Sequence, residues 1–188
     1  NVILRKGRVT NTFGGGEKTE VSSAKITFDG DVNTENIYGG SKDTGKTGKT
    51  EISLNSGIAQ NVYGAGLNTG AGETEVILNG AEITNIYGGA KNEGNVDKTI
   101  VEINKISEKE PNIYGGNYQG GSVTETNVNI KENVELTNIY AGNYRAGNAI
   151  STKLIIDGTV TNAFGGNYQG GIANNTNVVV NGTTENVY

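Results

Sequence analysis

The chain of 188 residues contains no cysteine, histidine, methionine or tryptophan, and it contains a single proline. Without cysteine and histidine it cannot form a disulfide bond, a zinc site built on thiolate or imidazole, a thiol nucleophile or a histidine-based triad. The near absence of proline argues against a disordered tract rich in glycine and proline, although the 30 glycines are about twice the usual share of about 7%. Composition therefore excludes several enzyme classes before any pattern is considered.

Long runs of one residue class are missing as well. No apolar run is long enough for a membrane-spanning helix or a signal peptide, so we expect no membrane insertion of this segment. The net charge is −5, and no run of lysine and arginine offers a surface for nucleic acid. We also expect no cofactor and no metal ion. Because the chain does not begin with methionine, we interpret residues 1–188 as a single domain from a longer repetitive chain.

One short motif occurs many times. The stretch TNIYGG at Thr84–Gly89 returns as PNIYGG at Pro111–Gly116 and as TNIYAG at Thr137–Gly142, and looser copies occur elsewhere. The aromatic residues of successive copies are 24 to 27 positions apart: Phe13, Tyr38, Tyr63, Tyr87, Tyr114, Tyr140, Phe164 and Tyr188. A regular period of this length is typical of a repeat architecture.

A second element precedes each aromatic residue and has apolar residues two positions apart, which is the pattern of a short strand. The first apolar column is Val2, Ile26, Ile52, Val76, Val101, Val128, Leu154 and Val178. The second column is Leu4, Phe28, Leu54, Leu78, Ile103, Ile130, Ile156 and Val180. Each repeat can therefore send two side chains into a shared core.

An asparagine stands two residues before every aromatic residue: Asn11, Asn36, Asn61, Asn85, Asn112, Asn138, Asn162 and Asn186. We expect it at a sharp bend, since asparagine tolerates the left-handed backbone conformation, and in a hydrogen-bonded ladder with its neighbours. A meander of β-hairpins is the main alternative, because Asn79-Gly80 and Asn181-Gly182 are hairpin signals. A stack of parallel coils accounts better for the same residue at the same place in every repeat.

This pattern resembles the asparagine ladder of right-handed parallel β-helix proteins of the pectate-lyase-like superfold. The resemblance covers the whole chain and implies an all-β fold, a single-stranded parallel β-helix of about eight coils of 24–27 residues. In such a fold we interpret NIYGG as a corner followed by the start of a strand. The spacing does not decide whether the aromatic residues face inward or outward in a ladder of stacked rings, and their uniform size favours the inward orientation. The glycine pair then permits a second turn or a close backbone approach.

The last three repeats carry near-identical loops, NYQGG at 117–121, NYRAG at 143–147 and NYQGG at 167–171. Their tyrosines, Tyr118, Tyr144 and Tyr168, should lie in a row about 4.8 Å apart. Polar side chains flank the tyrosines: Asn117, Gln119, Asn143, Arg145, Asn167 and Gln169. Aromatic rings with amide donors beside them suit sugars, so this row is the candidate glycan-binding site. The alternative is that the tyrosines only stack and cover the coils.

The carboxylates follow no common column. A glycosidase needs two of them about 5 to 9.5 Å apart, but Asp29 and Asp31 flank a glycine in a predicted turn. Charges close to the strand columns favour a solvated face of mixed sign: Lys25, Glu51, Glu75, Glu102 and Lys153. We therefore predict no catalytic residue and no enzymatic activity.

The glycine- and asparagine-rich repeats also resemble those of bacterial surface proteins, namely adhesins and autotransporter passengers. This resemblance implies a non-catalytic structural or adhesion segment, an extracellular rod on a bacterial cell surface. A host glycan or a cell-surface polymer would be its partner. Two alternatives stay open: a polysaccharide lyase or hydrolase without a visible active site, and a filament or sheath component that self-associates end to end. An acid–base cluster on adjacent coils would favour the enzyme, and fibre growth would favour the filament.

Overall fold

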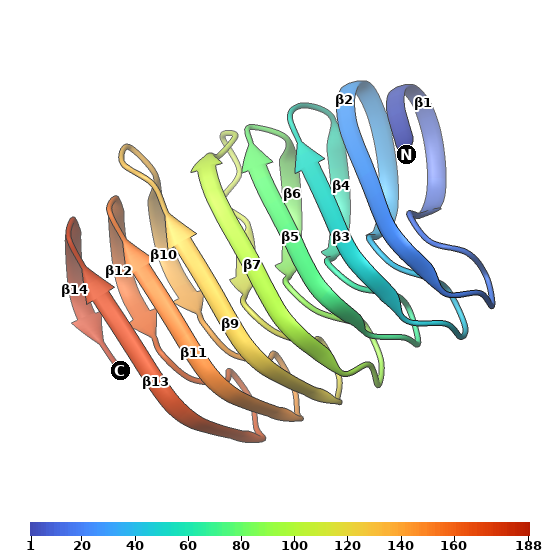
Figure 1. Cartoon of the computed structure of the whole chain (residues 1–188). Helices are drawn as coiled ribbons and strands as arrows, with labels where there is room; N and C mark the ends of the chain where they lie inside the picture. The colour runs from blue at the N-terminus through green and yellow to red at the C-terminus, as the bar shows by residue number, and fades with distance from the viewer.

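A computed structural model describes all residues, 1–188, and consists of strands and their connections (Figure 1). The strands are β1 (Val2–Phe13), β2 (Val21–Tyr38), β3 (Thr47–Leu54), β4 (Ile58–Tyr63), β5 (Ala71–Asn79), β6 (Glu82–Tyr87), β7 (Val96–Lys105), β8 (Asn112–Tyr114), β9 (Ser122–Ile130), β10 (Glu135–Tyr140), β11 (Asn148–Ile156), β12 (Thr159–Phe164), β13 (Ile172–Val180) and β14 (Thr183–Val187). No helix long and apolar enough to cross a membrane is present.

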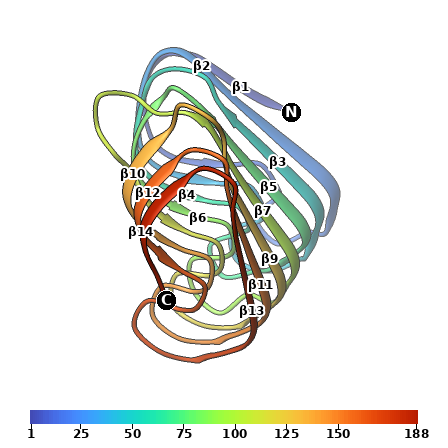
Figure 2. The ribbon, with the colours of Figure 1, turned by 90° about the vertical axis from the view of Figure 1, so that its left-hand side faces the viewer.

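The strands stack into two walls joined at one end by the long strands β1 and β2. One wall runs from β3 through the odd-numbered strands to β13, and the other runs from β4 through the even-numbered strands to β14 (Figure 1). Every pairing is parallel, and equivalent residues of successive repeats lie opposite each other, as Ile52 does to Val76. Figure 2 shows the coils one behind another. The chain is therefore a parallel β-solenoid of about seven turns, and the hairpin meander is excluded.

The predicted apolar columns form the core between the two walls. Val2 lies opposite Ile26, Leu54 lies opposite Leu78, and the columns continue through the later odd-numbered strands. The second wall contributes the residue before each aromatic, such as Ile86, which is fully buried in the same cluster. Removing apolar surface from water contributes about 25 cal/mol per Å². The repeat pattern thus stabilises the fold mainly through one continuous aliphatic core.

A column of buried threonines joins the first wall to the corner that follows the second wall. These residues stand two positions before the first apolar column, and their hydroxyls donate to backbone carbonyls after the aromatic residues: Thr50 to Gly64, Thr74 to Gly88, Thr99 to Gly115, Thr126 to Ala141 and Thr152 to Gly165. This column was not predicted from the sequence. Its signal is a threonine at the same register position in successive odd-numbered strands.

We expect Thr99→Val to lower the free energy of unfolding by about 1–3 kcal/mol, because it keeps the side-chain shape and leaves the Gly115 carbonyl without its 2.5 Å hydrogen bond. Urea unfolding followed by circular dichroism measures the change. The matched control is Thr124→Val, since Thr124 lies exposed on β9 and should change stability by less than about 0.5 kcal/mol. Equal effects at the two positions would contradict a structural role for the buried hydroxyl.

The predicted place of the asparagines is wrong, although their ladder is confirmed. The asparagines lie within the strands, and Asn133 is the one non-glycine residue with positive φ, at 66°. NIYGG is therefore the end of a strand followed by a corner. Amide nitrogens donate to the asparagine oxygen of the preceding coil at six of the seven steps, at 2.9 to 3.1 Å. The ladder runs along the outside of the second wall, since strand alternation sends the next residue inward.

The predicted inward orientation of the repeat aromatics is also wrong. Tyr87 is two residues from Asn85, so both side chains point away from the aliphatic core, while Ile86 points into it. Tyr38, Tyr63, Tyr87 and Tyr114 are nevertheless at most 6% exposed and form a cluster of their own. They are covered from outside by the loops that follow the corner, which is why residue type alone suggested an inward orientation.

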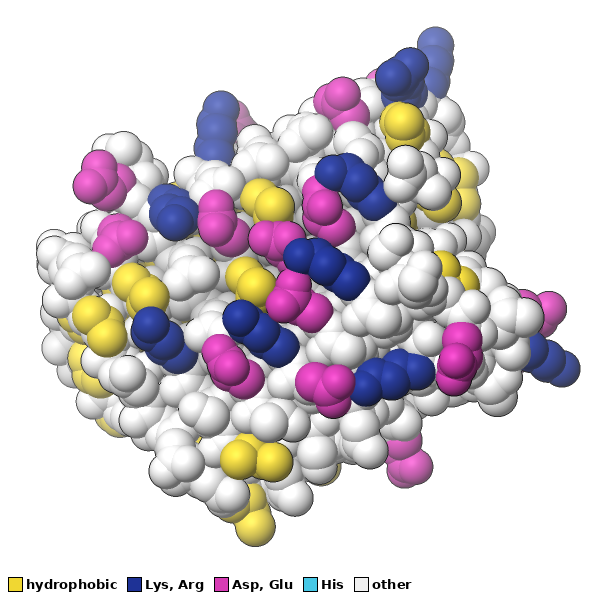
Figure 3. Space-filling view, in the orientation of Figure 1, with side chains coloured by type: hydrophobic (Ala, Val, Ile, Leu, Met, Phe, Trp, Pro, Cys, Tyr) yellow, Lys and Arg dark blue, Asp and Glu magenta, His cyan; other side chains and the backbone are white.

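The outer face of the first wall carries interleaved charges of both signs (Figure 3). Ion pairs link neighbouring coils there, including Lys25 with Glu51, and Lys49 with Glu73 at 2.8 Å. The side chains of these pairs are about a third to a half exposed, so each pair contributes at most about 1 kcal/mol. The expectation of a solvated face of mixed charge is confirmed.

Candidate binding site on the tyrosine flank

The repeat aromatics lie on the outer face of the second wall and stack along it. We call this stack the inner aromatic ladder, because other side chains cover it from outside. Successive rings stack with centroids 4.5 to 5.5 Å apart, in the order Phe13, Tyr38, Tyr63, Tyr87, Tyr114, Tyr140, Phe164 and Tyr188. The stacking follows from the register, since each aromatic lies opposite its equivalent in the next coil. The ladder gives this flank a continuous aromatic layer, most of which is covered by the loops outside it.

The outer tyrosine row, Tyr118, Tyr144 and Tyr168, covers the later part of the inner aromatic ladder. Its ring centroids are 5.1 and 5.3 Å apart, which confirms the predicted row. Each ring meets the inner aromatic ladder edge to face, as Tyr144 does with Tyr114 at 4.8 Å and 69°. Because the rings stack on one another, mainly their edges and hydroxyl groups are left to meet a ligand.

The asparagines that were predicted to bind a ligand beside this row form hydrogen bonds with the backbone. Asn117 and Asn143 are fully buried, and Asn167 is partly buried. Their side-chain oxygens accept hydrogen bonds at 2.8 Å from the backbone nitrogens of Ala90, Asn117 and Asn143 respectively. These bonds fix each NYxxG loop on the preceding coil. The asparagines therefore position the tyrosines and leave ligand contacts to other side chains.

The remaining predicted site residues lie on the surface of the same loops. Gln119, Arg145 and Gln169 are exposed. The Arg145 guanidinium lies 5.4 Å from the centre of the Tyr118 ring and 6.0 Å from that of Tyr144, within the range of a cation–π contact. The structure thus brings the predicted tyrosines and these three side chains together on one flank.

Burial raises the pKa of Tyr63, Tyr87 and Tyr114 far above the ordinary tyrosine value, and repulsion from neighbouring tyrosinates adds to the effect. The pKa values of Tyr38 and Tyr140 are raised for the same main reason, which is burial. These phenols are therefore neutral at physiological pH and can act as hydrogen-bond donors.

The raised pKa values predict a loss of stability in alkali. A folded-state pKa above the unfolded value of about 10 contributes stability that is complete below pH 10 and is lost as the pH rises above it. We expect the free energy of unfolding, measured with urea, to fall as the pH rises from about 10 to 12. Lysines lose charge in the same range, so the comparison is with Tyr87→Phe, which should show a shallower fall. Identical slopes for the two proteins would contradict the prediction.

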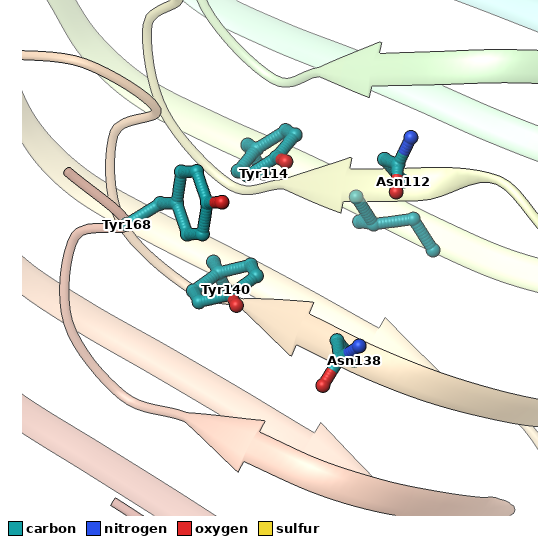
Figure 4. A pocket seen from close by; sticks show the side chains of 6 residues that line it. Asn112, Tyr114, Asn138, Tyr140 and Tyr168 are labelled. Carbon is teal, nitrogen blue, oxygen red and sulfur yellow. The ribbon is translucent and has the colours of Figure 1, made fainter.

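A pocket of about 120 Å³ opens where Tyr168 reaches back over the second wall. It is lined by Asn112, Ile113, Tyr114, Asn138, Tyr140 and Tyr168. Figure 4 shows Tyr168 beside Tyr114 and Tyr140, with its hydroxyl directed toward the side where the asparagines lie. Tyr168 is the most exposed ring of its row, at 46%. The pocket therefore combines three phenol hydroxyls with two amide side chains.

The same pocket lies at the one step where the asparagine ladder is broken. Asn112 donates to Asn85 at 3.0 Å, and Asn162 donates to Asn138 at 2.9 Å, but no hydrogen bond joins Asn138 to Asn112. Strands β8 and β10 diverge at these two asparagines. They pair only further along, where Ile113 and Tyr114 lie opposite residues of β10. This site was not predicted from the sequence.

An insertion accounts for the divergence. The connection between β7 and β8 is the longest of its kind, and it projects from the stack in Figure 2. It ends in Pro111, which has no backbone N–H to donate to a neighbouring coil. Beside it, the Glu110 carboxylate accepts hydrogen bonds from the backbone N–H and the hydroxyl of Thr137. The signal available in the sequence was the longer spacing of 27 residues between Tyr87 and Tyr114.

The acidic residues form no group of three that could hold a metal ion. Comparisons with protein-family models, with curated proteins and with solved structures found no match.

Proposed function

We propose that the chain is a structural and adhesion segment, a β-solenoid rod that presents a carbohydrate-binding flank. The observation that carries the proposal is the double layer of tyrosines, which ends in a pocket lined by phenol hydroxyls and amides. Phenols and amides can donate to and accept from sugar hydroxyls, while ring edges contact the apolar C–H surface.

The rest of the rod supports a scaffold role. A solenoid held by one aliphatic core and by ladders on its surface is extended and repetitive, so it separates a binding flank from whatever carries it. The resemblance of the repeats to those of bacterial adhesins and autotransporter passengers favours an extracellular position on a cell surface. A host glycan or a cell-surface polymer is the partner that fits this placement.

The test is binding of the purified chain to a broad glycan array, beside the variant Tyr168→Phe. This variant removes a single hydroxyl from the pocket and leaves the stacked ring in place. We expect specific glycan binding by the original chain and a reduction of about fivefold or more in the variant.

The matched control is Tyr38→Phe, which removes a phenol hydroxyl from the inner aromatic ladder, outside both the pocket and the outer tyrosine row. It should bind as the original chain does. Absence of any specific binding by the folded original chain would reject the adhesion role and leave a purely structural rod.

A further inference from the structure

The break in the asparagine ladder leaves two complementary groups open at the pocket. The Asn112 side-chain oxygen accepts no hydrogen bond from Asn138, and the Asn138 side-chain nitrogen donates none. Figure 4 shows the Asn112 oxygen on the side of Asn138. At every other step of the ladder these two kinds of atom are joined directly, at 2.9 to 3.1 Å.

A group inserted at the break must therefore donate to Asn112 and accept from Asn138. A secondary amide in its ordinary trans form does this, because its N–H and C=O point in opposite directions. Such a group would restore the ladder across the gap. The ring edges of Tyr114 and Tyr140 line the same space and offer apolar contact for a methyl group, while the Ile113 side chain points into the aliphatic core.

The size of the pocket limits what can enter. Its volume of about 120 Å³ is well below the roughly 300 Å³ of pockets that enclose a whole drug-sized ligand. The pocket thus suits one substituent of a larger molecule that lies across the rim. Phenol hydroxyls of Tyr140 and Tyr168 at the rim can hydrogen-bond with the hydroxyls of a sugar ring.

We infer that this pocket binds the acetamido group of an N-acetylhexosamine, with Asn112 and Asn138 holding its N–H and C=O. The inference rests on the proposed carbohydrate-binding function and names its substrate class. Asn112 and Asn138 are the specificity-determining residues, and Tyr168 closes the outer side of the pocket.

The test compares two ligands by calorimetric titration of the full chain: the tetramer of N-acetylglucosamine and the tetramer of glucose, which lacks the acetamido group. We expect the acetylated tetramer to bind about tenfold or more tightly, since the glucose tetramer leaves Asn112 and Asn138 unpaired in the complex. Equal binding of both tetramers would overturn the inference and keep the carbohydrate-binding function. Binding of neither would overturn the inference, and the glycan array then decides the carbohydrate-binding function separately.

The discriminating variant is Asn138→Asp. It keeps the oxygen that accepts from Asn162 and replaces the open N–H₂ group with a second oxygen. Affinity for the acetylated tetramer should fall about tenfold or more, with the glucose tetramer unaffected. Unchanged affinity in this variant would overturn the assignment of Asn138.

The matched control is Asn11→Asp. The Asn11 oxygen accepts from Asn36 and its nitrogen has no partner, so the change in chemistry and charge is the same at a site outside the pocket. It should bind both tetramers as the original chain does. A capped alanine amide is added as a competitor, and competition as strong as that of the acetylated tetramer would assign the pocket to peptides and overturn the inference.

Discussion

Replacing Tyr87 with alanine is expected to lower the free energy of unfolding by about 3–5 kcal/mol. The ring lies between Tyr63 and Tyr114, with centroids 5.1 and 5.2 Å away, and the outer tyrosine row meets it through Tyr118 at 5.0 Å. Its removal leaves a cavity under that row, and the stacked neighbours cannot close it without moving their own coils. Urea unfolding of the two proteins measures the difference.

The control for this prediction is Tyr87→Phe, which keeps the ring and removes a hydroxyl that makes no hydrogen bond with another side chain. It should change stability at neutral pH by less than about 1 kcal/mol. An alanine variant as stable as the phenylalanine variant would contradict the prediction. It would show that the inner aromatic ladder does not contribute to stability and that the aliphatic core alone stabilises the fold.

Gly147→Ala is expected to destabilise the chain by about 3 kcal/mol or more. Two costs add at this position: its φ of 89° is unfavourable for a residue with Cβ, and the new Cβ would overlap the backbone carbonyl of Gly121 in the preceding coil. Gly147 ends the loop that carries Tyr144, so relief of the overlap should also shift the outer tyrosine row. Thermal unfolding and the near-ultraviolet circular dichroism of the tyrosines measure the two effects.

Gly120→Ala is the matched control for this change. Gly120 precedes the equivalent loop end in the previous repeat, its Cβ would meet only the Glu93 side chain at 3.5 Å, and the next repeat already has alanine at this place, Ala146. We expect a change of less than about 0.5 kcal/mol. If both alanine variants were equally stable, close stacking of the loops on one another would be contradicted.

The coil and its core could be predicted from the sequence because their causes are local and repeated. Residues two apart on a strand share a face, so Ile52 and Leu54 specify one inward surface, and the same pair in the next repeat specifies the register. Asn85 and its equivalents predicted a ladder for a similar reason. A parallel stack places identical amides at hydrogen-bonding distance without any further condition.

Whether the aromatic side chains point toward the core or away from it could not be predicted from the sequence in the same way. Strand alternation places Tyr87 on the outer face with Asn85, but its ring is buried by Tyr118 and Tyr144, which belong to later coils. When a loop from another repeat buries a side chain, the spacing of the repeats along the sequence does not reveal it. The sequence showed a uniformly aromatic column and could not show which surface covered it.

The pocket could not be predicted from the sequence, for a different reason. It depends on where the connection before Pro111 leads the chain, and on the loss of pairing between β8 and β10 at Asn112 and Asn138. Both asparagines follow the repeat pattern perfectly, so the sequence predicted an unbroken ladder. The tyrosine row was predicted correctly, whereas the gap beside Tyr168 follows from a single irregular loop.

The most direct test of the account is a nuclear magnetic resonance titration of the chain, isotopically labelled at tyrosine, with the N-acetylglucosamine tetramer. The chain contains no tryptophan or histidine, so its nine tyrosines can be followed with few overlapping aromatic signals. The account predicts saturable shifts in the ring signals of Tyr114, Tyr140 and Tyr168, with Tyr38 and Tyr63 unchanged. Shifts centred on other tyrosines, or no shifts at the highest ligand concentration, would contradict the claim that this pocket binds the acetamido group of N-acetylglucosamine.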